Sequence, residues 1–346
     1  MSPTELAAEL KKRARAAGAD LAGIAAAAPS SGGPAYDAWL AANMHGEMDY
    51  MSRNAASRRD IRAWMQDAKS VLICGFSYGE PGARHASKEG HGRLARYAAR
   101  EDYHQILRGR MNEIGVWLSA AVAGARGLAF CDMSPILERS YAAAAGLGWQ
   151  GKNTMLLGSD IGSYVLIAGL AMNIDLPGDS AGPDRCGSCT KCRDACPTDA
   201  FANARVLNAS KCISYFTIES KGTIPESFRE EIGDWIFGCD ICQEVCPWNR
   251  FEKPARALPP ARIATELPLE DLVGPSSAGV RSRLKGLPVA RAARKRLTRN
   301  VLLAMGNSRL GRYRLILEEY ASGADPLLAE QARWSLARLP RLSGSA

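Results

Sequence analysis

The chain has 346 residues, of which 47% are hydrophobic and 23% are charged, and its formal net charge is +8. This composition is that of a globular protein with room for one large core or two to three smaller ones. No stretch of about 18 apolar residues is free of charges or breakers, so no membrane span is predicted. Basic residues precede an Ala-rich stretch that Asp20 interrupts, which makes a poor export signal and indicates a cytoplasmic protein.

Three segments follow one another along the chain. Residues 1–180 alternate helical patterns with short apolar runs, which is typical of an α/β domain. Residues 181–255 hold eight of the ten cysteines, and residues 256–346 have helical periodicity throughout. Helices are predicted over residues 4–17, 103–123, 135–145, 291–305 and 326–339, and strands over residues 71–76, 128–131 and 164–168.

The cysteines are placed for metal or redox chemistry, because a long chain without an export signal has little use for disulfides. Cys186, Cys189, Cys192 and Cys196, followed by Pro197, have the spacing of bacterial ferredoxins. In that run three thiolates hold one 4Fe–4S cluster and the fourth reaches a second cluster. Cys239, Cys242 and Cys246 repeat the run without its first member, whose position is taken by Ile236, and Cys212 can supply the missing thiolate.

Two clusters are therefore predicted. Cys186, Cys189, Cys192 and Cys246 are expected to hold one, and Cys196, Cys212, Cys239 and Cys242 the other. The alternative is a pair of zinc sites, since two Cys-x2-Cys units are also zinc spacing. Zinc does not explain why the full ferredoxin run occurs once and nearly completely again. Cys74 lies in an apolar run and is expected to be a buried strand residue. Two clusters in series form an electron path, so the preceding residues should hold the acceptor.

Positive charge is concentrated near the end of the chain. Eleven Lys and Arg residues and no Asp or Glu lie between positions 281 and 314. Such a run is often only a solvated face, but unrelieved self-repulsion favours a polyanionic partner. Phosphate contacts would explain it. We therefore expect one helix to present these residues to RNA: Arg291, Arg294, Lys295, Arg296 and Arg299.

Two further features have competing interpretations. Gly146 to Lys152 spells G-x4-G-K, but Asn153 stands where a phosphate-binding loop needs Ser or Thr, so a nucleotide triphosphatase is rejected. Asp132 follows an apolar stretch, at a strand end where α/β sites collect. Kept protonated by burial, it could act as a general acid. Alternatively it caps a helix whose first turn contains Pro135.

Several blocks resemble the epoxyqueuosine reductase family. They are residues 132–139 (DMSPILER), 145–154 (AGLGWQGKNT), 102–104 (DYH) with Tyr97, 212–219 (CISYFTIE) and 238–242 (GCDIC). The resemblance implies a cobalamin-dependent enzyme with two 4Fe–4S clusters that removes the epoxide oxygen of epoxyqueuosine in the tRNA anticodon loop. It also implies C-terminal HEAT-like repeats that bind the anticodon stem-loop. By the same resemblance Asp132 is the proton donor.

By this resemblance the cobalamin is base-off, without a protein histidine on cobalt. Its pocket residues would be Arg58, Tyr97, Asp132, Lys152, Asn153, Ser163, Ser214 and Asp240. We further expect an external low-potential electron donor, no membrane partner and a monomer. The competing hypotheses are a cobalamin enzyme like the reductive dehalogenases, and a non-catalytic iron–sulfur electron carrier that binds RNA.

Overall fold

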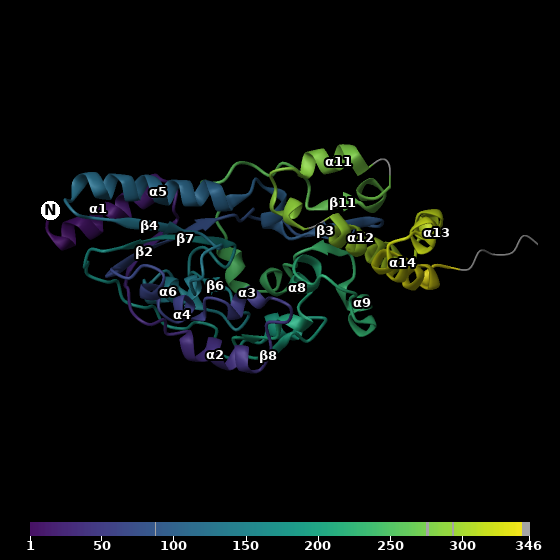
Figure 1. Ribbon diagram of the computed structural model, residues 1–346, viewed down its shortest axis with the longest axis horizontal. Coiled ribbons are helices and arrows are strands. Elements are labelled where there is room, and N and C mark those ends of the chain that lie inside the picture. Colours follow the sequence, from purple (N-terminus) through teal and green to yellow (C-terminus); the bar gives the residue numbers. More distant parts are fainter. Residues whose placement is uncertain (87, 275–276, 293, 341–346) are drawn as a thin grey trace, which may run out of the picture.

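The structure is a computed structural model that describes residues 1–86, 88–274, 277–292 and 294–340. Its largest sheet has the strand order β1-β2-β7-β4, and all neighbouring strands are antiparallel (Figure 1). These strands are β1 (Leu21–Ala26), β2 (Ser70–Ser77), β4 (Gly127–Phe130) and β7 (Val165–Met172). The mixed α/β class is confirmed. The strand-end rule for parallel sheets does not apply to Asp132, because this sheet is antiparallel.

Helices cover both faces of the sheet. In Figure 1, α1 (Pro3–Ala16) and α5 (Tyr103–Ala121) lie over one face, and α6 (Glu138–Ala144) packs on the other. Side chains of β2 alternate between the two layers. Leu72, Cys74 and Phe76 join the buried cluster under α1 and α5, whereas Val71 and Ile73 join the cluster beside α6. Cys74 is therefore the buried strand residue that was predicted.

Two chain segments bring polar side chains to the end of β4. Asp102 caps α5 by accepting a hydrogen bond from the His104 backbone N–H at 3.1 Å, which places His104 in the first turn. Beyond β4 the chain turns at Asp132, whose φ is +55°. α6 begins at Glu138 and not near Pro135 as predicted. Asp132 therefore does not cap α6, and helix capping does not explain its side chain.

The cysteine segment is built from short elements. Its helices are α7 (Lys191–Asp194), α8 (Ile213–Ile218), α9 (Glu226–Ile232) and α10 (Ile241–Glu244). The hairpin of β8 (Phe201–Asn203) and β9 (Val206–Leu207) lies between α7 and α8 in sequence. Nearby are β5 (Trp149–Gln150), which pairs with β6 (Leu156–Leu157), and the helices α2 (Gly33–Ala41), α3 (Asp49–Ser52) and α4 (Ala55–Arg59).

A small sheet joins all three expected segments. β3 (His91–Leu94) pairs in parallel with β10 (Trp235–Phe237) and antiparallel with β11 (Glu266–Pro268). Segments far apart in sequence therefore share one core, which also includes Leu302 and Met305. The three-domain division remains a prediction, but the segments are not separated in space.

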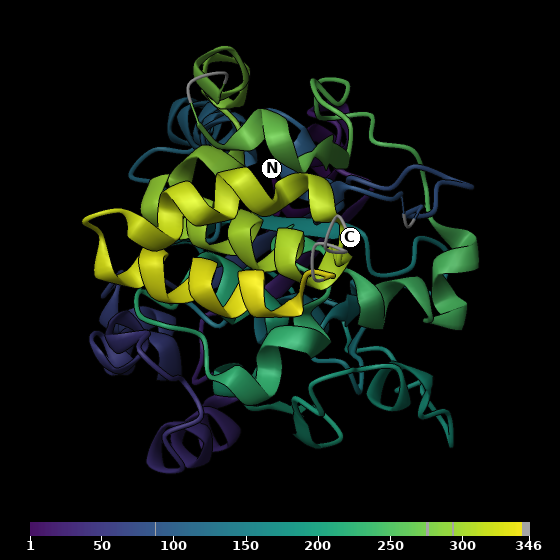
Figure 2. The same cartoon turned by 90° about the vertical axis from the view of Figure 1, so that its right-hand side faces the viewer.

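The C-terminal segment begins with a connector and β11, so it is not helical throughout as predicted, and its described α-helices start at residue 277. It contains α11 (Ser277–Leu284), α12 (Arg294–Ser308), α13 (Arg314–Ser322) and α14 (Pro326–Arg338). α12 packs against β10, α8 and α14, and Figure 2 shows these last helices stacked side by side at one end of the molecule. In the described ranges we find no helix with the length and apolar character that a membrane crossing requires.

Candidate active site

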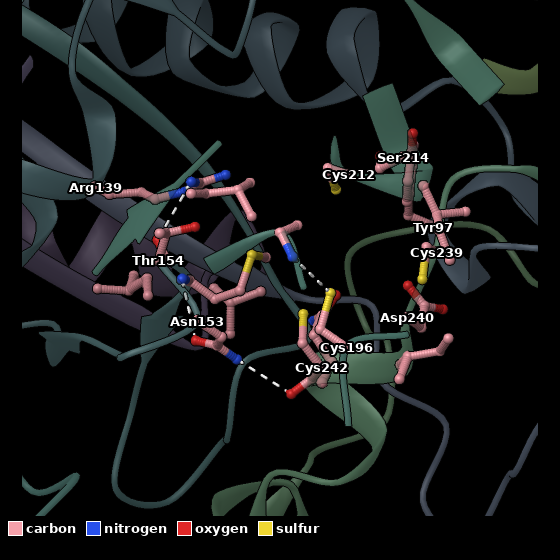
Figure 3. Close-up of a pocket in the computed structure, with 18 of the residues that line it drawn as sticks. Tyr97, Arg139, Asn153, Thr154, Cys196, Cys212, Ser214, Cys239, Asp240 and Cys242 are labelled. Atoms are coloured by element: carbon pink, nitrogen blue, oxygen red, sulfur yellow. Dashed lines mark hydrogen bonds between the residues drawn. The ribbon is translucent and has the colours of Figure 1, made fainter. Parts of the chain in front are cut away.

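Eight cysteines line two cavities that share Asn153 in their walls. The cluster cavity, with a volume of about 230 Å³, is lined by Cys186, Cys189, Cys192 and Cys246. The central cavity, of about 370 Å³, is lined by Cys196, Cys212, Cys239 and Cys242, whose sulfur atoms surround one space in Figure 3. The fold thus gathers the cysteines into the two groups that the spacing suggested. All ten are free cysteines.

Local structure explains why Cys212 joins the second group. The single-turn helices α7 and α10 pack together and bring the two cysteine runs side by side. Ile236, at the position where a fourth cysteine would complete the second run, is fully buried in β10. Cys212 instead precedes α8 and faces the central cavity.

Among the described residues, the thiols of the two groups are not gathered around the position of a single ion. No three His, Cys, Asp or Glu side chains among the described residues lie close enough to share one metal ion. A cubane separates its four ligands by a core of iron and sulfide atoms, so it needs a wider arrangement. Burial raises the pKa of Cys239 and Cys242 well above the ordinary value. These thiols therefore need the positive charge of bound iron to become thiolates.

The central cavity extends from the cysteines to the end of β4. Its polar lining includes five of the eight residues predicted to contact cobalamin: Asp132 and, as labelled in Figure 3, Tyr97, Asn153, Ser214 and Asp240. Its other side is apolar and comes from β6 and β7, with Leu156, Val165, Leu166 and Ile167. A cavity with one apolar wall and a polar rim can hold a large flat ligand that carries hydrogen-bonding groups at its edge.

Three predicted cobalamin contacts lie elsewhere. Lys152 lines the cluster cavity, where its Nζ donates to the carbonyl oxygens of Gly187 (2.7 Å) and Cys189 (2.9 Å). Ser163 is buried among Asn249 and Gln243 and does not line the central cavity. Arg58 lines a third cavity. Lys152 and Ser163 therefore lie outside the central cavity, and their contact with cobalamin stays a prediction.

This outer cavity, of about 510 Å³, meets the central cavity at three residues that line both: Tyr97, Tyr103 and Asp132. Its remaining walls include three cations, Arg58, Arg291 and Arg296. Arg58 is only 8% exposed, and its Nη1 donates a long hydrogen bond of 3.4 Å to the Arg53 carbonyl. The outer cavity therefore suits a polar, anionic ligand that reaches Asp132 from the side opposite the cysteines.

Asp132 lies at the centre of a polar network. The Tyr103 hydroxyl donates to Asp132 Oδ2 at 3.0 Å, and His104 Nε2 lies 2.7 Å from the same oxygen. The other ring nitrogen of His104 hydrogen-bonds to Asp102. Arg291 Nη1 lies 2.8 Å from His104 Nε2. The carboxylates at its two nitrogens favour a doubly protonated His104, whereas the Arg291 guanidinium, which can only donate, opposes a proton at Nε2.

The sequence suggested that burial keeps Asp132 protonated, but the pKa shifts in this network point the other way. Burial alone would lower the pKa of His104, but hydrogen bonds to Asp132 and Asp102 outweigh it and the pKa is raised. Burial would raise the pKa of Asp132, but the hydrogen bond and charge of His104 lower it overall. Asp132 is therefore not kept protonated by burial. In this state the proton belongs to the Asp132–His104 pair and resides mainly on the imidazole.

Glu138 is a second acid at the site. Its Oε1 accepts a hydrogen bond from the Asp132 backbone N–H at 2.6 Å, and it also lines the central cavity. Burial and the nearby charge of Asp132 raise the pKa of Glu138 to about 8. Sequence reasoning did not assign Glu138 a role. Only its position could have pointed to it, because Glu138 is the first residue of α6, the helix that follows the Asp132 loop.

Two family models match the chain. Residues 58–133 match the model described as "Epoxyqueuosine reductase QueG, DUF1730", and residues 185–249 match a "4Fe-4S double cluster binding domain". The first range includes both Arg58 and Asp132, and the second contains all eight clustered cysteines.

Similar proteins of known sequence and structure indicate the same family as these two models. An epoxyqueuosine reductase from Cellulophaga algicola is 44% identical over 221 residues, which cover 64% of this chain and 71% of that protein. The enzyme from Gloeobacter violaceus is 37% identical and covers 89% of this chain and 98% of its own length. The chain belongs to the epoxyqueuosine reductase family. A solved epoxyqueuosine reductase with an epoxyqueuosine-modified tRNA-Tyr stem loop superposes with a TM-score of 0.86 at 28% identity, covering 96% of this chain and 90% of that one.

The predicted RNA-binding residues of this chain fall into three groups. Arg291 and Arg296 line the outer cavity. Arg294 and Lys295 are exposed in the first turn of α12, where Lys295 also pairs with Asp325 at 2.8 Å. Arg299 is fully buried.

The prediction for Arg299 is wrong. Its guanidinium donates to the carbonyl oxygens of Ser220 and Phe216 and to Asn300, so it joins α12 to α8. Burial, with the neighbouring charge of Arg296, lowers its pKa to about 10. A run of cations in the sequence does not separate those facing solvent from those that satisfy buried carbonyl groups.

Proposed function

We propose that this chain converts epoxyqueuosine to queuosine in the anticodon loop of tRNA, with two 4Fe–4S clusters and a base-off cobalamin as its cofactors. The conversion consumes two electrons and two protons, releases the epoxide oxygen as water and leaves a carbon–carbon double bond. The observation that carries the proposal is the position of Asp132. It lies where a cavity that reaches four cysteines meets a second cavity rimmed by arginines.

The two cysteine groups are the proposed cluster ligands. One cluster would be held in the cluster cavity by Cys186, Cys189, Cys192 and Cys246, and the other beside the central cavity by Cys196, Cys212, Cys239 and Cys242. The double-cluster family model over residues 185–249 supports this arrangement. Two clusters in series would carry electrons from the surface of the protein toward the central cavity.

The central cavity is the proposed cobalamin site. Its apolar wall from β6 and β7 suits a corrin face, while Tyr97, Asn153, Ser214 and Asp240 can bind the polar groups at the corrin edge. When bound, cobalamin would supply the strongly reducing, nucleophilic centre that no side chain can provide. Among the described residues no histidine lines this cavity, and the proposed base-off state needs none.

Asp132 and His104 are the proposed proton source. The opened epoxide leaves an oxygen that must be protonated before it departs, and Asp132 is the carboxylate that both cavities share. His104 can pass its proton across the 2.7 Å to Asp132 Oδ2, and the carboxyl so formed can then donate it to the departing oxygen. Tyr103 orients the same oxygen from the other side.

The reaction should fall off at high pH. The pKa of His104 is raised by Asp132 and Asp102, so the pair keeps its proton through neutral pH and loses it as the pH rises past that raised value. We expect the single-turnover rate of prereduced enzyme to fall about tenfold per pH unit above this point. In His104→Gln the fall should begin at lower pH. A falling limb that does not move in this variant would show that His104 does not hold the proton.

The C-terminal helices, which we propose to be HEAT-like, would bind the anticodon stem-loop. Arg294, Lys295 and Arg296 occupy the first turn of α12, where the helix dipole disfavours cations by about 0.3–1 kcal/mol each. Phosphate binding would explain why such residues are placed there. Arg291 and Arg296 extend the same positive surface into the outer cavity, toward Asp132.

Salt dependence tests this surface. Replacing Arg294 and Arg296 by alanine should weaken tRNA binding and reduce the slope of log K against log salt by about 0.7–0.9 for each phosphate that is no longer neutralised. Arg333→Ala is the matched control, because Arg333 is exposed on α14 and donates to the Ala321 carbonyl. If the double variant keeps the wild-type slope in a fluorescence-anisotropy titration, RNA binds another face.

The whole proposal is tested by anaerobic reconstitution with iron, sulfide and cobalamin, followed by assay on tRNA that carries epoxyqueuosine. We expect conversion to queuosine that depends on both cofactors and on a low-potential electron donor. The protein is proposed to act in the cytoplasm as a monomer, where its tRNA substrate is found. A protein that binds zinc in place of iron, or that shows no cobalt absorption after reconstitution, would refute the assignment.

A further inference from the structure

The cluster cavity opens at the surface of the protein, and its exposed rim is positively charged. Three cations line it, Lys152, Arg185 and Arg250, and the described lining contains no carboxylate. Arg185 and Arg250 are exposed. The Arg250 guanidinium carbon lies 4.5 Å from the centroid of the Phe251 ring. Lys191 and Arg193, on either side of Cys192, add two more positive charges next to the same cysteine group.

Nearby carboxylates cancel little of this charge. Asp184 pairs with Arg205, and Asp160 pairs with Lys253 at 2.8 Å, so each already neutralises a cation outside the rim. Asp194 accepts a hydrogen bond from the Thr190 hydroxyl at 2.7 Å and is the one further acid carried on α7. The rim as a whole therefore keeps a positive surface around the opening of the cluster cavity.

Aromatic side chains connect this rim to a cysteine. Trp149 Nε1 lies 3.4 Å from Cys186 Sγ, and the Trp149 ring packs edge-on against Trp248 at 5.0 Å between centroids. Trp248 in turn contacts Phe251, which is 39% exposed beside Arg250. Exposed aromatic residues next to arginines are the side chains that are enriched at protein–protein interfaces.

We propose that this rim is the docking surface for a small acidic protein that carries one electron at a time. This inference rests on the proposed function, which requires an external donor but does not say where the donor binds. In each encounter the carrier is oxidised by one electron and the cluster in the cluster cavity is reduced by one, so two encounters supply the two electrons that the epoxide consumes. The central cavity is the wrong place for a donor, because it holds the reaction.

Charge complementarity selects this partner. A positive patch accelerates the association of an oppositely charged protein by about 10- to 1000-fold at low ionic strength, and salt suppresses the effect. A neutral or basic carrier would gain nothing from Arg185 and Arg250. The competing role for these cations is to balance the negative charge of the cluster itself, and in that case they would affect every reductant alike.

The experiment follows reduction of the reconstituted clusters by stopped-flow absorbance, without tRNA and without cobalamin. One reductant is an acidic plant-type ferredoxin, prereduced, and the other is the methyl viologen radical cation, a small dye. In the double variant Arg185→Glu and Arg250→Glu, we expect the rate with ferredoxin at low salt to fall by about tenfold or more and to lose its salt dependence. The rate with the dye should not fall.

Controls separate the outcomes. Lys12→Glu is the matched charge reversal on α1, where Lys12 is 80% exposed, and it should leave both rates unchanged. Iron content must equal that of the wild type; if the double variant loses iron, Lys191→Glu and the salt dependence of the wild-type rate provide the same test. A ferredoxin rate that is unaffected, or an equal slowing with both reductants, would overturn the proposal. Because RNA and cobalamin are absent, failure of the epoxide assay would not alter these readings.

Discussion

Replacing Asp132 by asparagine is expected to reduce epoxide reduction by about 10²- to 10⁴-fold, the usual range for loss of a general acid. Asparagine keeps the size of the side chain and an oxygen that can accept from Tyr103, so the cavity should not collapse. It cannot donate the proton that the departing oxygen needs. The measurement is single-turnover conversion of epoxyqueuosine in tRNA by prereduced enzyme.

Three readings make the result specific to proton transfer. Iron content, the absorption spectrum of bound cobalamin and tRNA affinity should all match the wild type, because no cluster ligand or arginine has changed. Asp67→Asn is the control, since Asp67 pairs with Arg126 on the surface, away from both cavities. Conversion at the wild-type rate in Asp132→Asn would remove this residue from the mechanism and leave Glu138 and Asp240 as the other acids that line the central cavity.

The position of Asp132 could be predicted from sequence better than its charge state. The block around it carried the family resemblance, and the structure places it between two cavities. Its protonation depends on His104, which is 28 positions away along the chain and donates from another element. A pKa set by a long-range partner cannot be read from local sequence, so the sequence pointed to a carboxyl kept neutral by burial, whereas the hydrogen bond and charge of His104 lower the pKa of Asp132.

The cysteines were more predictable because their spacing is itself geometric. Each run has one cysteine on a single-turn helix, Cys192 on α7 and Cys242 on α10, and its other cysteines lie in the adjoining turns, so the short spacing keeps the thiols of a run close together. The sheet was less predictable. β1 was missed because its Ala and Gly residues have weak strand propensity, and an antiparallel order cannot be inferred from apolar runs alone.

A buried charge network connects the cysteine segment to β3. Asp240, next to Cys239, accepts from the Arg96 backbone N–H at 2.7 Å and lies 3.2 Å from His85 Nε2. Arg96 also donates to Glu252 at 3.2 Å. These pairs join the loop of the second cysteine run to residues that precede and follow β3. They therefore link the proposed cluster sites to the part of the chain that lines the proposed cobalamin site. This explains why the expected segments are not spatially separate.

Replacing Cys212 by alanine is expected to have the other large effect. Cys212 belongs to neither ferredoxin run, yet it lines the central cavity with Cys196, Cys239 and Cys242. If it is the fourth ligand of the second cluster, its loss should remove about four of about eight irons per chain, or leave a labile cluster in their place. Electron flow to the central cavity would then stop, and epoxide reduction should fall below detection even with excess reductant.

Cys74→Ala is the matched control for this experiment. Cys74 is a buried thiol in β2 whose pKa burial raises to about 12, and it lines neither the cluster cavity nor the central cavity, so it is not placed to act as a ligand. Its replacement should lower stability slightly and leave iron content unchanged. Iron and zinc are counted by elemental analysis, and the remaining cluster is followed by low-temperature electron paramagnetic resonance after reduction. A Cys212→Ala protein that still holds about eight irons and reduces the epoxide would mean that a non-cysteine group completes the second cluster. The proposed ligand set, which draws on three chain segments, would then be wrong at Cys212, the one ligand that the spacing of the two runs did not determine.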